Sequence, residues 1–99
     1  MQYQVNFTPS AEQDLKYLQA YEQRIIIAAL QSFLMEEASV ESNRRKQLKP
    51  NELAPWELRA GKYRIFYELR VEEIKVVAIG YKEHNELLVR GKKVELWQH

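Results

Sequence analysis

The sequence predicts one α+β domain in which two helices pack on one face of an antiparallel β-sheet. Apolar residues recur at helical spacing between residues 8 and 34, whereas they alternate with charged residues from Trp56 onward. The helical and the strand-like patterns therefore occupy separate parts of the chain, which is typical of the α+β class. A chain of 99 residues has the length of one domain, so we expect residues 1–99 to form a single unit.

The first two predicted elements are a short strand and a helix. Gln2–Phe7 alternates apolar and polar residues, as a half-buried strand does. A helix is expected to begin at Thr8 and Pro9, because threonine is a good N-cap and proline suits the first helical position. Ser10, with Gln13 three residues later, is a competing start for the same helix.

A second helix is expected from about Tyr21 to Leu34. Its apolar residues keep helical spacing, and Ile25 and Ile27 are expected to widen its buried face. The break near Ala20 is very short, so the two helices form either an antiparallel hairpin or one bent helix.

The segment Ser39–Ala54 is predicted to be a mostly irregular connection. It combines a Ser42-Asn43 pair with a basic cluster and Pro50-Asn51, and such residues favour turns over regular structure. Leu48 and Leu53 are its expected contacts with the core. Connections of this length in small domains are often functional.

Three or four strands are expected to complete the domain. Residues 55–60 and 62–70 flank a glycine turn, and the apolar residues on both sides of residues 72–81 indicate a central, doubly covered strand. Leu87–Leu96 is either a hairpin around Arg90-Gly91-Lys92 or one strand with a bulge. The helices should cover one face of this sheet, and the basic residues of the later strands should line the other, half-open face.

Positive charge is concentrated between residues 44 and 64. The net charge of the chain is only +1, yet residues 1–43 are acidic on balance and residues 44–99 are basic. This asymmetry is typical of proteins that bind nucleic acid or an acidic partner, although an ordinary solvated surface is an equal alternative. The candidate nucleic-acid-binding residues are Arg44, Arg45, Lys46, Lys49, Arg59 and Lys62.

Arg64 is the leading candidate for chemistry. Side chains alternate along a strand, so Arg59 and Arg64 are expected on the charged faces of neighbouring strands. The arginine fork suits a phosphate, and we expect the Arg64 guanidinium to lie in an open, positively charged hollow. The alternative is that the two arginines form ion pairs with Glu57 or Glu68 across the strands.

Two more candidates follow the expected central strand. Lys82 stands where it would lie beside Arg64, and His84 is of the residue type that transfers protons near neutral pH. The alternative for His84 is a histidine in a surface turn, which the residues alone favour.

Several classes of protein are not indicated by the composition. The chain has no cysteine, and it carries no phosphate-binding glycine loop and no cluster of metal-ligand residues, so we expect neither a metal nor another cofactor. No secretory signal and no apolar run of membrane-spanning length is apparent, so we expect a cytoplasmic protein without a membrane partner.

Three motifs stand together in the order known from one family of small proteins. They are Thr8-Pro9-Ser10-Ala11, Arg59-Ala60-Gly61-Lys62-Tyr63-Arg64-Ile65-Phe66-Tyr67 and Val77-Ala78-Ile79-Gly80-Tyr81-Lys82. In these motifs the chain resembles the RelE/ParE superfamily of toxins from type II toxin–antitoxin modules. The resemblance covers most of the sequence and implies a helical hairpin against a twisted antiparallel sheet. It also implies a cognate antitoxin that wraps the toxin and holds it inactive.

The resemblance implies one of two activities. RelE-like toxins cleave mRNA in the ribosomal A site without a metal, through attack by a ribose 2′-OH that basic residues assist. In that case Arg64 would stabilise the transition state, Lys82 would bind the phosphate and His84 would act as acid or base. ParE-like toxins instead inhibit DNA gyrase.

Three positions depart from the RelE-like pattern. Leu88 stands near the place of a tyrosine that stacks on the substrate base, and Pro55 and Glu57 stand where lysines are usual. We therefore carry forward a ribosome-dependent endoribonuclease as the first hypothesis. A ParE-like gyrase inhibitor is the second. The third is a decayed or non-catalytic toxin that only binds its antitoxin.

Overall fold

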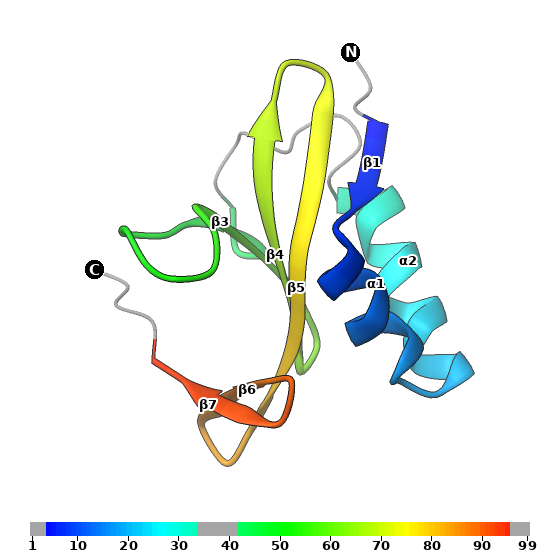
Figure 1. Cartoon of the computed structure of the whole chain (residues 1–99), viewed down its shortest axis with the longest axis vertical. Helices are drawn as coiled ribbons and strands as arrows, with labels where there is room; N and C mark the ends of the chain where they lie inside the picture. Colours follow the sequence, from blue (N-terminus) through cyan, green and yellow to red (C-terminus); the bar gives the residue numbers. More distant parts are fainter. Residues whose placement is uncertain (1–3, 34–41, 96–99) are drawn as a thin grey trace.

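In the computed structural model, two helices lie against one side of a strongly twisted β-sheet (Figure 1). The structure describes residues 4–33 and 42–95. The elements, in chain order, are β1 (Gln4–Phe7), α1 (Pro9–Lys16), α2 (Ala20–Phe33), β2 (Arg45–Gln47), β3 (Trp56–Ala60), β4 (Tyr63–Arg70), β5 (Glu73–Glu83), β6 (Glu86–Val89) and β7 (Lys92–Val94). The predicted fold class is confirmed. The expectations for Gln2, Leu34, Ser39 and Leu96 lie outside the described residues.

The two helices begin with local caps and form a hairpin. Thr8 is the N-cap of α1, because its Oγ1 accepts the backbone N–H of Ala11 at 3.1 Å. The start at Thr8 and Pro9 is therefore confirmed, and the competing start at Ser10 is not used. Before α2, the backbone N–H of Gln19 donates to Glu22 Oε1 at 3.1 Å, as in a capping box. Because each helix has its own cap, the two helices are separate. The predicted hairpin is confirmed, and the alternative of one bent helix is wrong.

β5 is the central strand of the sheet, as the sequence predicts. It runs antiparallel to β4 along one edge. Along its other edge it pairs first with β1, in parallel, and then with β6, antiparallel. The hydrogen-bonded order of the remaining strands is β2-β3-β4-β5-β6-β7.

The sheet contains more strands than the sequence predicts. β2 lies in the segment that was expected to be irregular, and its three residues pair with β3, so that Gln47 lies opposite Trp56. A strand this short and polar shows no alternation of apolar residues in the sequence. It is a strand because it pairs with β3. The last segment is a hairpin of β6 and β7, in which Arg90 and Gly91 have φ values of 54° and 76°. Two central residues with positive φ are what a type I′ turn requires.

The face of the sheet toward the helices, here called the helix-side face, carries the larger apolar cluster. It includes Ile26 and Leu30 of α2 and, from the strands, Leu58, Ile65 and Tyr67. The rings of Trp56 and Tyr67 stack there with their centroids 5.9 Å apart. In the described ranges, no helix is both long and apolar enough to cross a membrane.

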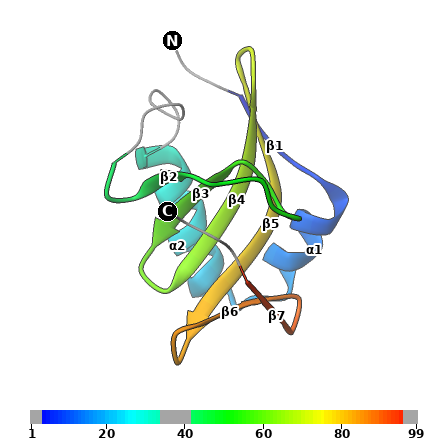
Figure 2. The ribbon, with the colours of Figure 1, turned by 90° about the vertical axis from the view of Figure 1, so that its left-hand side faces the viewer.

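The opposite face, here called the outer face, is not the half-open basic surface that we expected. Its second apolar cluster consists of Leu48, Ala54, Phe66, Ala78, Leu87 and Val89. The loop after β2 and the β6–β7 hairpin supply the cover, and both are seen at the side of the sheet away from the helices (Figures 1 and 2). Phe66 is fully buried by them. Leu48 and Leu53 contact this second cluster, as predicted for the anchors of the loop.

Candidate functional site

The strand register brings three of the candidate cations to the outer face. Arg59 on β3 lies opposite Arg64 on β4, and Arg64 in turn lies opposite Gly80 on β5. Lys82 follows two residues after Gly80, so its side chain leaves the same face of the sheet. The sequence therefore placed Arg59, Arg64 and Lys82 correctly relative to one another.

Arg64 does not lie in an open hollow. Its side chain is half-buried, and Nη1 donates to the carbonyl oxygens of Gly61 at 2.7 Å and Tyr63 at 2.9 Å. Its Nε is buried and has no hydrogen-bond partner among the residues that the structure describes. Burial lowers the pKa of the Arg64 guanidinium, the charge of Glu57 opposes this change, and the charge of Arg59 adds to it. The side chain thus folds back onto its own turn, a contact that alternation along a strand does not reveal.

Arg59 forms an ion pair with Glu57, one of the two expected partners, but along its own strand β3 and not across strands. Its Nε lies 2.8 Å from Oε1 of Glu57, whose side chain is only 2% exposed. Glu68, the other expected partner, pairs with Arg70 instead, at 3.6 Å. In the strand register, Lys46 of β2 lies opposite Glu57, so the two side chains leave the same face of the sheet. The outer face therefore contains a carboxylate, that of Glu57, which offsets part of the positive charge of its arginine and lysine side chains.

Lys62 belongs to a different group of side chains. Its Nζ lies 5.5 Å from the ring centroid of Tyr63 and 5.8 Å from that of Tyr81. The hydroxyl of Tyr63 donates to Glu22 Oε2 at 2.5 Å, which ties β4 to the start of α2. Burial and this hydrogen bond raise the pKa of Tyr63, while the same bond and the N–H of Gln19 lower the pKa of Glu22.

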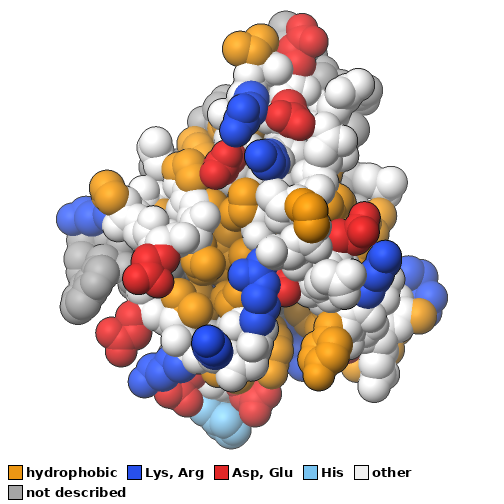
Figure 3. All heavy atoms as spheres, in the orientation of Figure 1, with side chains coloured by type: hydrophobic (Ala, Val, Ile, Leu, Met, Phe, Trp, Pro, Cys, Tyr) orange, Lys and Arg blue, Asp and Glu red, His pale blue; other side chains and the backbone are white. Residues whose placement is uncertain are grey.

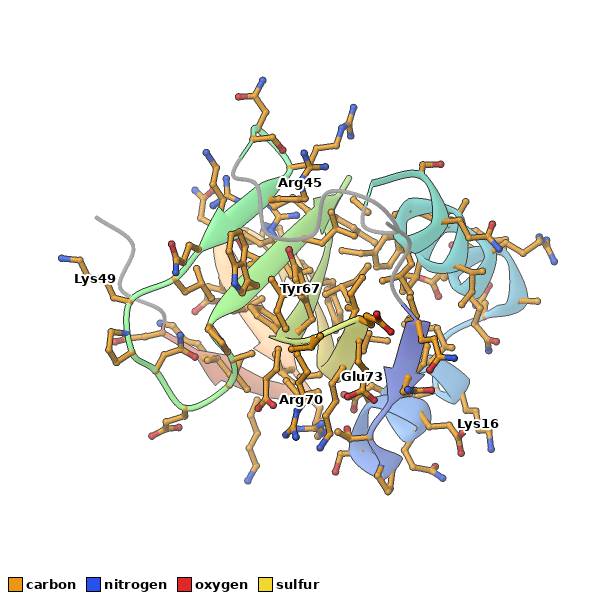
Figure 4. The ribbon with its side chains drawn as sticks, turned by 90° about the horizontal axis from the view of Figure 1, so that it is seen from above. Lys16, Arg45, Lys49, Tyr67, Arg70 and Glu73 are labelled. Carbon is orange, nitrogen blue, oxygen red and sulfur yellow. The ribbon has the colours of Figure 1, made fainter. Side chains whose placement is uncertain are left out.

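The remaining nucleic-acid-binding candidates lie on β2 or next to it. Arg45 is 8% exposed and lies opposite Leu58, on the helix-side face. Lys49 projects from the loop after β2, away from the sheet (Figure 4), and Arg44 is exposed just before β2. On the face seen in Figure 3, Lys and Arg side chains are interspersed with Asp and Glu around a hydrophobic centre. On this face the cations therefore do not form one continuous patch.

His84 occupies a tight turn. His84 and Asn85 have φ values of 53° and 66° and connect β5 to β6, and both side chains are exposed. The side chain of Lys82 is exposed, and its backbone N–H donates to the carbonyl of Lys62 at 2.7 Å. The described residues contain no group of three His, Cys, Asp or Glu side chains that could hold a metal ion.

Sequence reasoning missed an ion pair that closes a gap in the sheet edge. In the described part of the sheet, Ile79 of β5 lies between the residues that pair with β1 and those that pair with β6. Asp14 of α1 accepts the N–H of Ile79 through Oδ2 at 3.1 Å and binds Nε of Arg90 through Oδ1 at 2.9 Å. Nη2 of Arg90 donates to the carbonyl of Val77 at 3.2 Å. The partners are far apart in the sequence, so no spacing signals them.

The helices expose apolar side chains, and two of them, Ile25 and Ile27, were expected to be buried. Tyr17 is 94% exposed, Tyr21 54% and Ile25 42%, and Ile27 is exposed as well. The buried stripe of α2 is narrow, since Ile26, Ala29 and Leu30 already fill it. Three isoleucines in succession cannot all face one side of a helix, and this was the signal in the sequence.

Two hollows border the helices. One, of about 540 Å³, lies between α1 and the β5–β6 edge, with Tyr17, Leu18 and Leu88 in its lining. The other, of about 340 Å³, lies between α2 and the end of β3, beside Ile25 and Ala60. Exposed apolar side chains around concave surfaces are typical of sites that bind other proteins.

Comparisons with known proteins agree on one group. The family model of the ParE toxin of the type II toxin–antitoxin system parDE matches residues 5–86. Among solved structures, the fold is similar to a chain of the RelBE2 toxin–antitoxin complex from Mycobacterium tuberculosis, with a TM-score of 0.71 and 20% identity over 83% of this chain and 100% of that chain. A search of curated proteins found no significant match.

Proposed function

The chain belongs to the ParE toxin family of type II toxin–antitoxin systems, and we propose that it arrests growth by binding DNA gyrase rather than by cutting RNA. Gyrase inhibition is the activity that resemblance to the ParE-like branch implies. We favour gyrase over RNA because of one observation: the arginines of the motif bind other groups of the protein itself. Arg59 is paired with buried Glu57, and Arg64 donates to two backbone carbonyls.

The other candidate residues for RNA cleavage provide neither a well-placed proton-transfer group nor a ring that could stack on a base. General acid–base catalysis requires a proton-transfer group within hydrogen-bond reach of the reacting atoms. His84 is held in a turn beyond the end of β5, and Leu88 offers no ring that could stack on a base. The apolar surface on the helices is, by contrast, suited to contact with another protein.

We infer that a cognate antitoxin is a second protein partner. The chain shares its fold with a member of a toxin–antitoxin complex, and its helices carry exposed Tyr17, Tyr21 and Ile25 beside two hollows. An amphipathic helix or an added strand would cover such a surface. Toxin and antitoxin would meet in the cytoplasm.

Two assays with the purified toxin test the choice between gyrase and RNA. In the first, gyrase supercoils a relaxed plasmid in the presence of increasing toxin. In the second, an mRNA is translated with toxin present and its 5′ ends are mapped. We expect supercoiling to stop and the mRNA to remain uncut. Normal supercoiling with excess toxin, together with cleaved mRNA, would overturn the proposal.

A ribosome-dependent endoribonuclease is the second candidate, because Arg64 and Lys82 share the outer face. Within the described residues Arg64 forms no ion pair, so its charge is not directly cancelled by a bound carboxylate. This candidate would be favoured if the wild type cleaves the mRNA and Arg64→Ala leaves it intact.

The third hypothesis is a non-catalytic or decayed toxin. It is supported if the toxin neither stops supercoiling nor cleaves mRNA, and if expression of the chain without antitoxin leaves growth unchanged.

A further inference from the structure

We infer that Glu57 is a specificity determinant: its buried carboxylate keeps the cations of the outer face from binding RNA. The inference rests on the proposed function, because it explains how a fold with motif arginines on one face can act on a protein. The ligand that Glu57 excludes from the outer face is single-stranded RNA, a polyanion that a surface of arginine and lysine side chains would otherwise bind.

The arrangement of charges across three strands requires a counter-ion. Arg59 and Arg64 lie directly opposite each other on antiparallel strands, and like charges at such positions are destabilising. Lys46 approaches the same place from β2, where it lies opposite Glu57. Glu57 binds Arg59 directly, its charge acts on Arg64, and it lies opposite Lys46 in the strand register.

The burial of Glu57 makes it an effective counter-ion. Its side chain is 2% exposed and its Oε1 is 2.8 Å from Arg59 Nε, so solvent and salt screen the interaction poorly. The Arg59 side chain is 32% exposed and therefore reaches the surface of the same face. While it is held by Glu57, its Nε is directed inward and not to a phosphate outside.

Removal of the carboxylate should release this surface. Gln has nearly the shape of Glu but no charge, so Glu57→Gln raises the net charge of the outer face by one. It also weakens the hold on the Arg59 guanidinium, which would then turn outward. Each additional phosphate contact strengthens RNA binding and makes it more sensitive to salt.

The test is the affinity of the purified chain for a short fluorescein-labelled oligouridine, measured by anisotropy over a range of salt concentrations. Glu57→Gln should bind roughly threefold to tenfold more tightly than the wild type at low salt. The slope of log K against log salt should become steeper by about 0.7, the value for one more phosphate on a single strand. Glu12→Gln is the matched control, because it makes the same change of charge on exposed α1.

Double variants keep the test decisive if Glu57→Gln does not fold. Glu57→Gln with Arg59→Gln removes the charges of both partners of this ion pair, so that neither partner is left charged without the other. This double variant should bind RNA more tightly than Arg59→Gln alone, since the two differ only at Glu57. Circular dichroism shows whether each variant is folded.

Two results would overturn the inference. One is a folded Glu57→Gln with wild-type affinity and salt dependence, and the other is an equal gain of affinity in Glu12→Gln. The measurement contains neither gyrase nor ribosomes. Failure of the proposed function would therefore show in the supercoiling and mRNA assays, and failure of this inference would show in RNA binding.

Discussion

The two faces of the sheet are built from the same strands but by different means. The helix-side face is covered by α1 and α2, which follow β1 directly, and its cluster includes Leu58, Ile65 and Tyr67. The outer face is covered by the loop after β2 and by the β6–β7 hairpin. Phe66 is buried there, while Arg59, Arg64 and Glu57 lie on the same face. The alternation of residues along a strand thus shows which residues share a face, but it does not show what covers that face.

Phe66→Ala should have the largest effect, because it tests whether the outer face is a true core. The neighbours Ile65 and Phe66 are both fully buried, on opposite faces. We expect Phe66→Ala to lower the free energy of unfolding by about 3–5 kcal/mol and the matched Ile65→Ala by about 2–5 kcal/mol. Urea unfolding measures both. A cost below about 1 kcal/mol for Phe66→Ala would mean that the outer face is open.

Asp14→Ala should have the next largest effect, because Asp14 connects the helices to the hairpin that covers the outer face. The substitution leaves Arg90 Nε and the Ile79 N–H without this partner. The side chain of Asp14 is 6% exposed and that of Arg90 is 42% exposed, so we expect a loss of about 2 kcal/mol in thermal or urea unfolding. Glu12→Ala breaks an exposed pair with Lys16 and should cost less than about 0.5 kcal/mol. Equal costs for the two variants would show that the gap in the β5 edge needs no such bridge.

Gly80→Ala sharpens the comparison at the place where the hairpin approaches β5. A Cβ at position 80 would lie 2.4 Å from the carbonyl oxygen of Leu88, so β6 would have to shift. We expect a loss of about 1–3 kcal/mol and faster amide hydrogen exchange in β6. A Cβ at Gly61 would meet no atom of the described residues within 4 Å, so Gly61→Ala should cost about 1 kcal/mol through its φ of +61°. Unchanged exchange in β6 of Gly80→Ala would contradict this account.

Tyr63→Phe should have the smallest effect, and its signature is a dependence on pH. The lowered pKa of Glu22 in the folded protein means that its contribution is present above the ordinary value of 4.5 and is lost as the pH falls. The raised pKa of Tyr63 means that its contribution is present below 10.0 and is lost above it. The difference in unfolding free energy between wild type and Tyr63→Phe should therefore be largest between these two values. A difference that does not change with pH would show that the hydrogen bond is not formed.

Much of the fold could be predicted from local patterns. The cap at Thr8, the glycine turn at Gly61 and the central position of β5 each depend on residues that are near in sequence. β2 could not be predicted, because its pairing with β3 and not its composition makes it a strand. Ile25 was wrongly expected to be buried, since periodicity does not show how wide a stripe the sheet can cover.

The sequence predicted where the candidate residues lie on the sheet, but it did not predict which contacts their side chains make. The register confirmed that Arg59 and Arg64 are neighbours on one face. Whether an arginine is available for a ligand depends on contacts that alternation does not encode, such as the carbonyl of Gly61 or the carboxylate of Glu57. Asp14 and Arg90 were missed because the chain between them spans most of the domain.

Growth arrest by a variant that lacks the outer-face cations is the most direct test of the proposed action on a protein. The toxin is expressed without its antitoxin, as the wild type and as the double variant Arg64→Ala with Lys82→Ala. If the toxin acts by binding a protein rather than by cleaving RNA, the folded double variant should stop growth as the wild type does. Normal growth of cells that contain the folded double variant would contradict the account and point to RNA as the target.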